Sequence, residues 1–199
     1  MKLLLASHNF GKVKEFKELF KALDFIELMS LNDFPSYLPP EETGVTFKEN
    51  AVLKAQHAAN ALNVWTLADD SGLSVPILEN RPGVYSARYS GIDATDQENC
   101  NQLLTELLPY PTSEQRVAYY ECCLVICSPT EVKKCVEACC AGEIALAAKG
   151  NHGFGYDPLF IKNEYGKTFG ELDPSVKKRV SHRAKAVEKL IPFLESLRE

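Results

Sequence analysis

The sequence predicts an α/β fold, and three observations support this prediction. Apolar runs typical of strands alternate along the chain with segments whose apolar residues recur at helical spacing. No internal repeat and no low-complexity linker interrupts this alternation. The chain has 199 residues, of which 45% are hydrophobic and 25% charged, a composition that suits one domain, either with a single lobe or with two.

Four elements are predicted in the first part of the chain. Residues 2–6 form a buried strand, and residues 12–23 form a helix whose apolar side chains share one face. The capping box Thr46-Phe-Lys-Glu49 begins a second helix, which runs to about Leu62. Residues 64–68 form a short strand, which we expect the polar run Asp69-Asp70-Ser71-Gly72 to end.

The second part of the chain continues the alternation. Thr95-Asp-Gln-Glu98 is another capping box and begins a helix. Residues 117–127 and 132–147 are predicted to be strands. Asp173 and Pro174 begin the last helix as its N-cap and first position, and Pro192 is expected to kink or end it. Two segments lack a regular pattern, as functional loops often do, namely residues 30–45 and 82–94.

The composition limits the partners of the protein. A formal net charge of −5 argues against binding to nucleic acid or to an anionic membrane. A phosphate ligand is not excluded, because local donors and a bridging cation decide its binding. The apolar start, Leu3 to Ala6, is too short for a secretion signal or a membrane span, so we expect a cytoplasmic protein.

The seven cysteines are expected to be reduced core residues. The spacing Cys135-x3-Cys139-Cys140 lacks the second pair of ligands that zinc fingers and zinc ribbons have. We therefore interpret them as buried thiols and not as disulfide partners or zinc ligands. Five of them lie in apolar, strand-like surroundings, namely Cys122, Cys123, Cys127, Cys139 and Cys140.

The first candidate site is the segment Ala6-Ser-His-Asn-Phe-Gly-Lys12, between the first strand and the first helix. A strand-to-helix turn directs backbone N–H groups and the positive end of the helix dipole at its ligand, which favours an anion. Ser7 and Asn9 add donors, and Lys12 adds a positive charge. An ordinary turn, in which Asn9 caps the helix and Lys12 is solvated, explains the segment equally well. The Walker A pattern is absent.

The second candidate site is acidic. Asp69 and Asp70 follow a buried strand, and two adjacent carboxylates there are costly unless they are paired or bound to a cation. One or two carboxylates together with substrate phosphates are the ligands that Mg²⁺ prefers. Asp69 and Asp70 fit a simple turn cap as an alternative, and Glu41 and Glu42 fit a solvated loop.

The third candidate site is the glycine-rich segment Gly150-Asn-His-Gly-Phe-Gly-Tyr-Asp-Pro158. Closely spaced glycines indicate a backbone that approaches a ligand or takes positive φ angles. Phe154, between two of them, is placed for a base to stack on, whereas Tyr156 is interpreted as a core residue. A tight turn with both aromatic rings in the core is the alternative.

The fourth candidate site is the run Lys177-Lys-Arg-Val-Ser-His-Arg183 on the last helix. On a continuous helix, His182 and Arg183 lie on neighbouring stripes, and Ser181 lies close to Lys177. Arg183 supplies donors for a purine 6-oxo group or N7. A solvated basic face is the alternative, and this run alone does not decide between them.

Together these segments resemble the inosine triphosphate pyrophosphatase family, whose members remove non-standard purine nucleotides. The resemblance covers almost the whole chain, and the motifs keep the order and spacing of the family. They are Ala6–Lys12, Glu41–Ala51, Ala68–Leu73, Pro82–Gly91, Gly153–Phe160 and Ser181–Arg183. The resemblance implies an elongated mixed β-sheet with flanking helices, two lobes around a central substrate cleft, and a homodimer.

The resemblance also implies a role for each matching residue. Asp70 is the general base and a ligand of Mg²⁺, and it is assisted at the metal by Asp69 and by Glu41 or Glu42. The residues implied to bind the substrate are Ser7, His8, Asn9, Phe10, Gly11, Lys12, Ser71, Phe154, Gly155, Tyr156, Asp157, Lys177, His182 and Arg183. At position 8 the family more often has glycine, so the side chain of His8 is expected to crowd the turn.

The implied reaction is hydrolysis of ITP, dITP or XTP to the monophosphate and pyrophosphate. Water attacks the α-phosphorus with Asp70 as the base, and Lys12 and Lys54 stabilise the developing charge. Donors from Arg183 and the backbone pair with a 6-oxo purine and are left unpaired by adenine, which a polar site rejects strongly.

Three alternatives fit the sequence less well. The pyrophosphatases that act on modified pyrimidines carry start and lysine motifs that this chain lacks. A catalytically silent nucleotide sensor gains nothing from the costly pair Asp69-Asp70. A nucleic-acid-binding module is opposed by the acidic charge and by the lack of a basic, aromatic surface.

Overall fold

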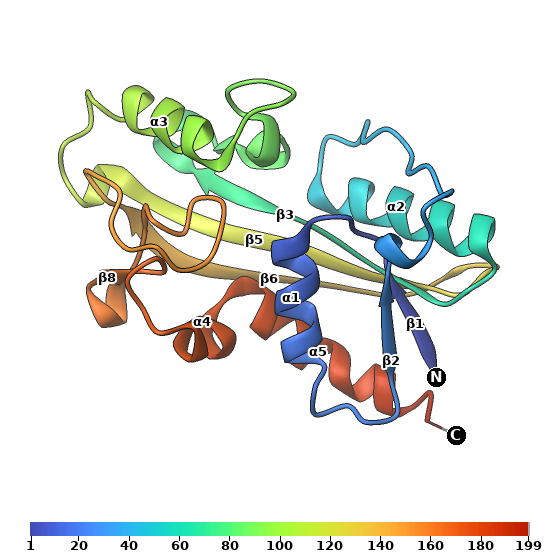
Figure 1. Cartoon of the computed structure of the whole chain (residues 1–199). Helices are drawn as coiled ribbons and strands as arrows, with labels where there is room; N and C mark the ends of the chain where they lie inside the picture. The colour runs from blue at the N-terminus through green and yellow to red at the C-terminus, as the bar shows by residue number, and fades with distance from the viewer. Residues whose placement is uncertain (199) are drawn as a thin grey trace. The chain divides into compact units, whose positions relative to one another are not determined.

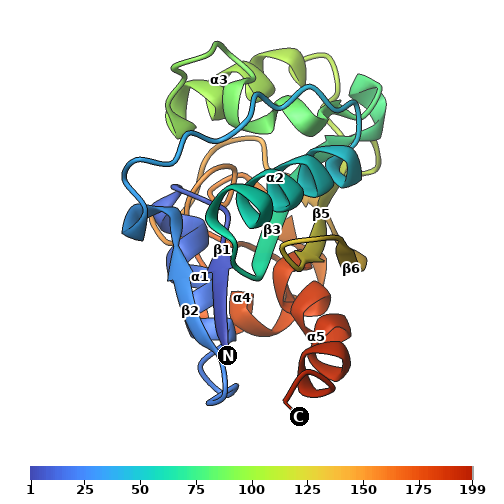
Figure 2. The same cartoon turned by 90° about the vertical axis from the view of Figure 1, so that its right-hand side faces the viewer.

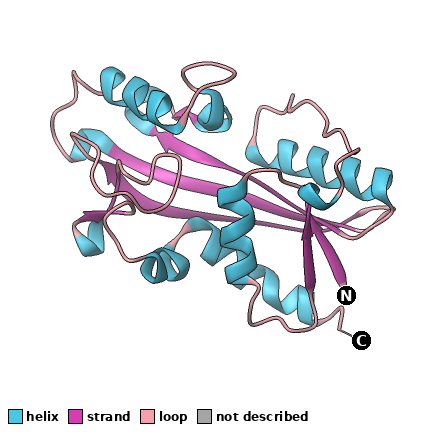
Figure 3. Ribbon diagram, in the orientation of Figure 1, coloured by secondary structure: helices cyan, strands magenta, loops and turns pink. Residues whose placement is uncertain are grey.

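Helices and strands alternate along the chain, as the sequence predicts for an α/β protein (Figures 1 and 3). The computed structural model of the protein describes residues 1–198. The chain divides into two units, each with its own core. Unit 1 consists of residues 1–70, 122–138 and the chain from residue 183 on, and unit 2 consists of residues 71–121 and 139–182.

Unit 1 is built on parallel strands. Strand β1 (Lys2–Leu5) pairs in parallel with β2 (Glu27–Ser30) on one side and with β3 (Thr66–Val75) on the other. Strands β5 (Val117–Cys127) and β6 (Val132–Ile144) follow β3 in the order of the sheet. Because β3, β5 and β6 are long, each contributes residues to both units.

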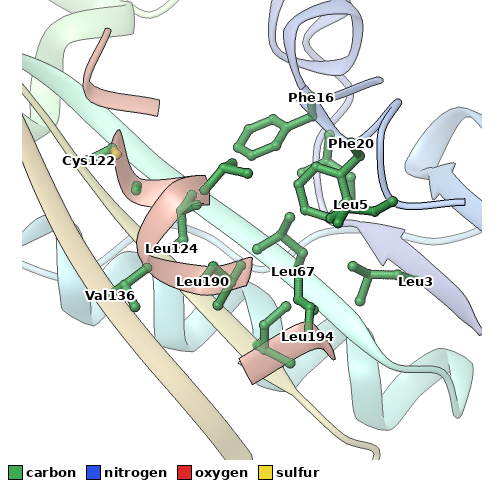
Figure 4. Packing of buried hydrophobic residues seen from close by; sticks show 14 of the residues in the cluster. Leu3, Leu5, Phe16, Phe20, Leu67, Cys122, Leu124, Val136, Leu190 and Leu194 are labelled. Atoms are coloured by element: carbon green, nitrogen blue, oxygen red, sulfur yellow. The ribbon is translucent and has the colours of Figure 1, made fainter. Parts of the chain in front are cut away.

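Helices cover both faces of the sheet of unit 1. Helices α1 (Phe10–Leu19) and α5 (His182–Glu195) lie on one face, where Phe16 and Leu190 pack with Leu67 of β3 (Figure 4). Helix α2 (Phe47–Leu62) lies on the other face, and its alanines pack there against Ala68 and other small side chains (Figure 2). Consecutive residues of β3 therefore face different helices, as the two-residue period of a strand requires.

Unit 2 has its own apolar core and its own antiparallel pairs. Strand β7 (Phe160–Lys162) pairs with β6 and with β8 (Lys167–Thr168), and β4 (Arg81–Pro82) pairs with β3. Leu103 and Leu107, in and just after helix α3 (Asp96–Glu106), pack with Phe160 in the core. The unit is completed by helix α4 (Pro174–Val180). Single turns of 3-10 helix lie at Leu31–Asp33, Pro76–Leu78, Glu114–Arg116 and Asn163–Tyr165, and a longer one lies at Gly83–Arg88.

The three helix starts predicted from capping residues are confirmed, whereas the first helix begins at Phe10 and not at residue 12. Thr46 is the N-cap of α2, where its side chain accepts a hydrogen bond from the Glu49 N–H. Thr95 and Glu98 form the full capping box of α3. The Asp173 side chain caps α4, and Pro174 takes its first position. These signals act within one helical turn, so the local sequence is enough to determine them.

The prediction that residues 69–72 end a strand is wrong. Strand β3 continues through them from Thr66 to Val75. Asp69 and Asp70 can remain inside the strand, because cationic side chains from the neighbouring helices pair with both carboxylates. Strand β2 also lies where no element was predicted, and the predicted first helix ends at Leu19 and not at residue 23.

The prediction of one continuous last helix is also wrong. Ser181 has an extended backbone, with φ −70° and ψ 162°, and it separates α4 from α5. Pro192 lies inside α5, because Leu190 and Leu194 on either side of it are fully buried in the core of unit 1. Side chains of residues 177–181 and 182–186 therefore do not line up along one continuous helix face, as a single helix would require. His182 belongs to unit 2 and Arg183 to unit 1.

No helix among residues 1–198 is both long enough and apolar enough to span a membrane.

Arg116 gives a test of the core of unit 2. Its buried guanidinium donates hydrogen bonds to the carbonyl groups of Leu107, Tyr110, Ile144 and Ala145, at 2.8–3.1 Å. Arg116→Met leaves these carbonyls without their donors, so we expect the free energy of unfolding to fall by about 3 kcal/mol or more. Urea unfolding followed by circular dichroism measures the change.

Arg81 provides the control for this prediction. Its exposed guanidinium pairs with Glu106, so Arg81→Met is expected to cost about 1 kcal/mol or less. Equal losses for the two variants would show that the buried hydrogen bonds of Arg116 do not stabilise the unit.

Candidate functional site

Asp69 and Asp70 form the centre of the candidate site. They are consecutive residues of β3, and each is more than nine-tenths buried. Leu67 packs on the α1 and α5 face of the sheet and Ala68 on the α2 face. The alternation continues, so the carboxylate of Asp69 meets α1 and α5 and that of Asp70 meets α2.

Asp69 pairs with two cations from different helices. Its Oδ2 lies 3.0 Å from Nζ of Lys12 in α1 and 3.1 Å from Nε of Arg183 in α5. The other side of the Arg183 guanidinium, at Nη1, pairs with Glu15 of α1 at 2.8 Å. Burial by itself raises the pKa of Asp69, but Arg183 and Lys12 outweigh it and hold the pKa well below its usual range. Asp69 is therefore a fixed anion.

Asp70 pairs with Lys54 of α2. The distance from Lys54 Nζ to Oδ1 of Asp70 is 2.6 Å, and Oε1 of Glu42 lies 3.0 Å from the same ammonium. The other oxygen of Asp70, Oδ2, is buried and has no hydrogen-bond partner among residues 1–198. Burial raises the pKa of Asp70, although Lys54 and Lys12 oppose the shift. A carboxylate with one oxygen paired and the other buried and available can serve as a base or as a metal ligand.

The ammonium groups of Lys12 and Lys54 meet at one carbonyl oxygen. Both donate to the backbone carbonyl of Asp69, Lys12 at 3.3 Å and Lys54 at 3.0 Å. Burial and the charges of Lys54 and Arg183 lower the pKa of Lys12. For Lys54, burial acts in the same direction, but Asp70 and Glu42 overcome it and the pKa is raised. Two cations held this close, beside a carboxylate, can neutralise adjacent phosphates.

The segment Ser7 to Lys12 was predicted either to bind phosphate or to form an ordinary capped turn, and it has features of both. Asn9 caps α1, because its side chain accepts from the Lys12 N–H at 2.9 Å. Lys12 is not solvated, since its side chain is 17% exposed and lies at Asp69. The Phe10 side chain is 80% exposed. His8 is also exposed, and its Nδ1 lies 3.3 Å from Oδ1 of Asn32. Of this segment, the structure brings only the Lys12 side chain to the carboxylates.

The structure distinguishes Glu42 from Glu41. Glu42 is half-buried at Lys54, whereas Glu41 is exposed. The loop that carries Glu42 is fixed two residues later, where the Gly44 N–H donates to the side chain of Asn50 at 2.7 Å. Asn50 is fully buried in α2, one turn before Lys54. The side-chain environment therefore favours Glu42 as the partner of Asp70.

In unit 2, Asp157 is the centre of the glycine-rich segment. Its Oδ2 lies 2.6 Å from Nζ of Lys177 and accepts from the Phe154 N–H at 2.9 Å. Its Oδ1 accepts from the Tyr120 hydroxyl at 3.3 Å. Gly153 has φ +79°, and a Cβ there would lie 1.9 Å from Oδ2 of Asp157, so only glycine allows the backbone this close. The buried carboxylate of Asp157 thus fixes the backbone of the glycine-rich segment through its hydrogen bonds.

The aromatic residues of this segment have different surroundings. Phe154 is half-buried, and the Lys177 ammonium lies over its ring, 4.8 Å from the centroid. Tyr156 is buried in the core and donates from its hydroxyl to the Ser86 carbonyl at 2.8 Å, as its interpretation as a core residue requires. His182 is buried and stacks on Tyr120, with 4.8 Å between ring centroids.

Three residues of these networks were not predicted from the sequence. Glu15 pairs with Arg183, and Tyr120 contacts Asp157 and His182. The Asp96 carboxylate accepts from the Gly155 N–H at 2.7 Å. Each contact joins residues far apart in the sequence, so no local pattern marks it. Ser71 follows Asp70 in β3 as a half-buried residue of unit 2.

Comparison with known proteins identifies the family. The sequence profile of the Ham1 family matches residues 3–193. This chain belongs to the Ham1 family. A dITP/XTP pyrophosphatase from Protochlamydia amoebophila is 54% identical over 199 residues, with full coverage of both chains. A dITP/XTP pyrophosphatase from Chlamydia abortus is 44% identical, and the match covers 100% of this chain and 97% of that protein.

Solved Ham1 structures have the same fold. The Ham1 protein of Staphylococcus aureus has a TM-score of 0.85 at 38% identity, with 98% of this chain and 99% of that chain covered. A HAM1 protein from Coxiella burnetii has a TM-score of 0.87 at the same identity and coverage. The predicted mixed α/β fold and the predicted family are therefore confirmed.

Lys177 tests the network of unit 2 in this Ham1 protein. Lys177→Met leaves the buried carboxylate of Asp157 without its cation, and we expect the free energy of unfolding to fall by about 3–5 kcal/mol. Met has nearly the helix propensity of Lys, so α4 itself is little affected. Chemical denaturation measures the loss.

Lys178→Met is the matched control, because Lys178 is the next residue of α4 and is exposed. We expect it to change the stability by about 0.5 kcal/mol or less. If Lys177→Met unfolds at the same denaturant concentration as this control, the Asp157 pair does not hold the segment.

Proposed function

We propose that this protein hydrolyses non-standard purine nucleoside triphosphates, such as dITP, XTP and ITP, to the nucleoside monophosphate and pyrophosphate. The observation that carries the proposal is the meeting of Lys12 and Lys54 at the Asp69 carbonyl, with the Asp70 carboxylate paired to Lys54. The names of the Protochlamydia and Chlamydia relatives support the choice of substrate. From the resemblance alone we also propose a homodimer that acts on the cytoplasmic nucleotide pool.

The carboxylates of Asp70 and Glu42 fit a magnesium ion. Oδ2 of Asp70 is buried without a hydrogen-bond partner among the described residues, and the Glu42 carboxylate lies at the same lysine. Such an oxygen-only pair, completed by water and substrate phosphates, suits Mg²⁺. When bound, the ion would offset the charge of the triphosphate and polarise a phosphate oxygen. Asp69 faces α1 and α5 on the other side of the sheet, where its carboxylate pairs with Lys12 and Arg183.

The protein's own side chains supply the remaining chemistry. Asp70 accepts a proton from the attacking water, and the raised pKa that results from its burial makes it a stronger base. The water oxygen forms a bond to the α-phosphorus, the bond from that phosphorus to the bridging oxygen breaks, and pyrophosphate leaves. Lys12 and Lys54 stabilise the charge that develops on the phosphate oxygens, since both are already held in place before the substrate binds.

We assign base recognition to Phe154 and to the motif Ser181-His182-Arg183. The Phe154 ring is half-buried beside the Lys177 ammonium, and an aromatic ring of this kind can stack with a purine base. A contact from Arg183 to a 6-oxo group would compete with its pairs to Asp69 and Glu15. Within unit 1, such a contact would therefore weaken the pairs that hold Asp69 as an anion.

Release of pyrophosphate from a panel of triphosphates tests the proposed function. We expect ITP, dITP and XTP to be hydrolysed in preference to GTP, ATP and UTP, and the reaction to require Mg²⁺. A binding protein without activity would take up nucleotide but release no pyrophosphate. Release of orthophosphate, or equal rates for ATP and ITP, would contradict the proposal.

Asp70→Asn tests the base. The amide cannot accept the proton of the attacking water, so we expect kcat to fall by about 10²-fold or more. Steady-state pyrophosphate release with ITP measures the change. Asp24→Asn is the control, because Asp24 is a highly exposed carboxylate and its variant should keep full activity. Turnover near that of the unmodified protein in Asp70→Asn would exclude Asp70 as the base.

The pair Glu41 and Glu42 tests the metal assignment. Glu42→Gln removes a charge beside Lys54 and Asp70, so we expect the Mg²⁺ concentration for half-maximal activity to rise by about tenfold, the lower end of the effect of altering a metal site. Glu41→Gln changes an exposed neighbour and should leave this concentration unchanged. Magnesium titrations of the two variants give the comparison, and the reverse order would assign the metal to Glu41.

A further inference from the structure

Two thiols and a carboxylate of unit 1 lie close together, and none of the three belongs to the networks described above. Sγ of Cys123 in β5 lies 3.3 Å from Sγ of Cys135 in β6. A carboxylate oxygen of Glu137 completes the group, and the three ligand atoms all lie within 4.8 Å of one another. Cys123 is buried, Cys135 is half-buried and Glu137 is exposed, so the group has an inner end in the core and an outer end in solvent.

The strands explain why these side chains meet. Cys122, Leu124 and Val136 point into the core beneath α1 and α5 (Figure 4). Their neighbours in β5 and β6 point to the other face, because side chains alternate along a strand. On that face Cys123 packs in the core with α2, and Cys135 packs against the same core. Cys135 and Glu137 are two residues apart in β6 and so share this face.

We propose that Cys123, Cys135 and Glu137 form a binding site for a thiophilic divalent cation of the Zn²⁺ type. Two sulfurs and one oxygen are ligands that zinc accepts, and they leave a fourth tetrahedral position for water at the exposed end. Mg²⁺ prefers oxygen ligands alone, so this site and the Asp70 site select different metals. Binding releases the two thiol protons to solvent, and the Glu137 carboxylate contributes its existing charge.

The distances are compatible with this coordination. With Zn–S bonds of about 2.3 Å in a tetrahedron, the two sulfurs lie about 3.8 Å apart. A small rotation of the half-buried Cys135 side chain would open the present 3.3 Å to that separation. A disulfide would require the sulfurs to close to about 2.05 Å and an oxidant to accept two electrons. The present arrangement is nearer to the metal geometry.

The prediction that the cysteines are buried core residues holds for five of the seven. Cys139 is exposed and Cys135 is half-buried. The structure contains no disulfide among the described residues. The pairing of Cys123 with Cys135 was not predicted, because twelve residues and a turn separate them in the sequence.

Titration of the freshly reduced, full-length protein with Co²⁺ tests the proposal. Cobalt replaces zinc at tetrahedral thiolate sites and gives a sulfur-to-cobalt charge-transfer band. We expect a single equivalent to saturate this band, excess Zn²⁺ to remove it and excess Mg²⁺ to leave it intact. Co²⁺ at the Asp70 site would have oxygen ligands and would give no such band, so the two sites are distinguishable.

Variants locate the ligands. Cys135→Ser is expected to abolish the band, and Cys139→Ser, an exposed cysteine of the same strand, is expected to retain it. Glu137→Gln should weaken Co²⁺ binding by at least about tenfold, the loss that even outer partners of metal ligands cause. Glu131→Gln, at an exposed position before β6, is its control. Pyrophosphate release should be unchanged in Cys135→Ser, which shows that the variant is folded.

Several results would overturn the proposal. They are the absence of the band in the reduced unmodified protein, its survival in Cys135→Ser and its loss in Cys139→Ser. A Cys123–Cys135 disulfide that forms in air, in a protein whose reduced form takes up no Co²⁺, would identify a redox pair instead.

Discussion

Two consecutive buried carboxylates in β3 are the constraint on which the candidate site depends. A strand presents neighbouring side chains to opposite faces, so the carboxylates of Asp69 and Asp70 form ion pairs with different helices. Each therefore requires its own partners, because an unpaired buried charge costs several kcal/mol. Helices α1 and α5 supply Lys12 and Arg183 on one face, and α2 supplies Lys54 on the other. This requirement brings three helices to one point of the sheet.

The same arrangement leaves the site suited to an anionic ligand. Lys12 and Lys54 approach the single carbonyl of Asp69 from their different helices, and each ammonium is largely removed from water. Oδ2 of Asp69 pairs with both Lys12 and Arg183, whereas Oδ2 of Asp70 is buried without a hydrogen-bond partner among the described residues. Positive groups held rigidly beside an available carboxylate oxygen are what phosphoanhydride hydrolysis requires, since little has to reorganise when the substrate binds.

Unit 2 uses a buried carboxylate in a similar way. The Asp157 carboxylate pairs with the Lys177 ammonium and accepts hydrogen bonds from the Tyr120 hydroxyl and the Phe154 N–H. These contacts hold the glycine-rich segment in place. The sulfur and carboxylate group at Cys123 and Cys135 follows a different chemistry, with ligands that suit a softer metal. The two proposed metal sites of unit 1 therefore differ in the type of cation that their ligands would select.

The sequence by itself determined the features that depend on neighbouring residues. Patterns within short segments predicted the α/β class, the place of Tyr156 in the core and the caps at Thr46, Thr95 and Asp173. The family followed from the order and spacing of motifs along almost the whole chain. A cap joins residues within one turn, so its signal is local.

Only the tertiary structure decided the features that depend on distant partners. These are the passage of β3 through Asp69 and Asp70, the break at Ser181, the ion pair of Glu42 with Lys54 and the pairing of Arg183 with Asp69. Arg183 and Asp69 are 114 residues apart. Whether a carboxylate ends a strand or is buried inside it depends on a cation from another element, and the residues beside it in the sequence do not specify that cation.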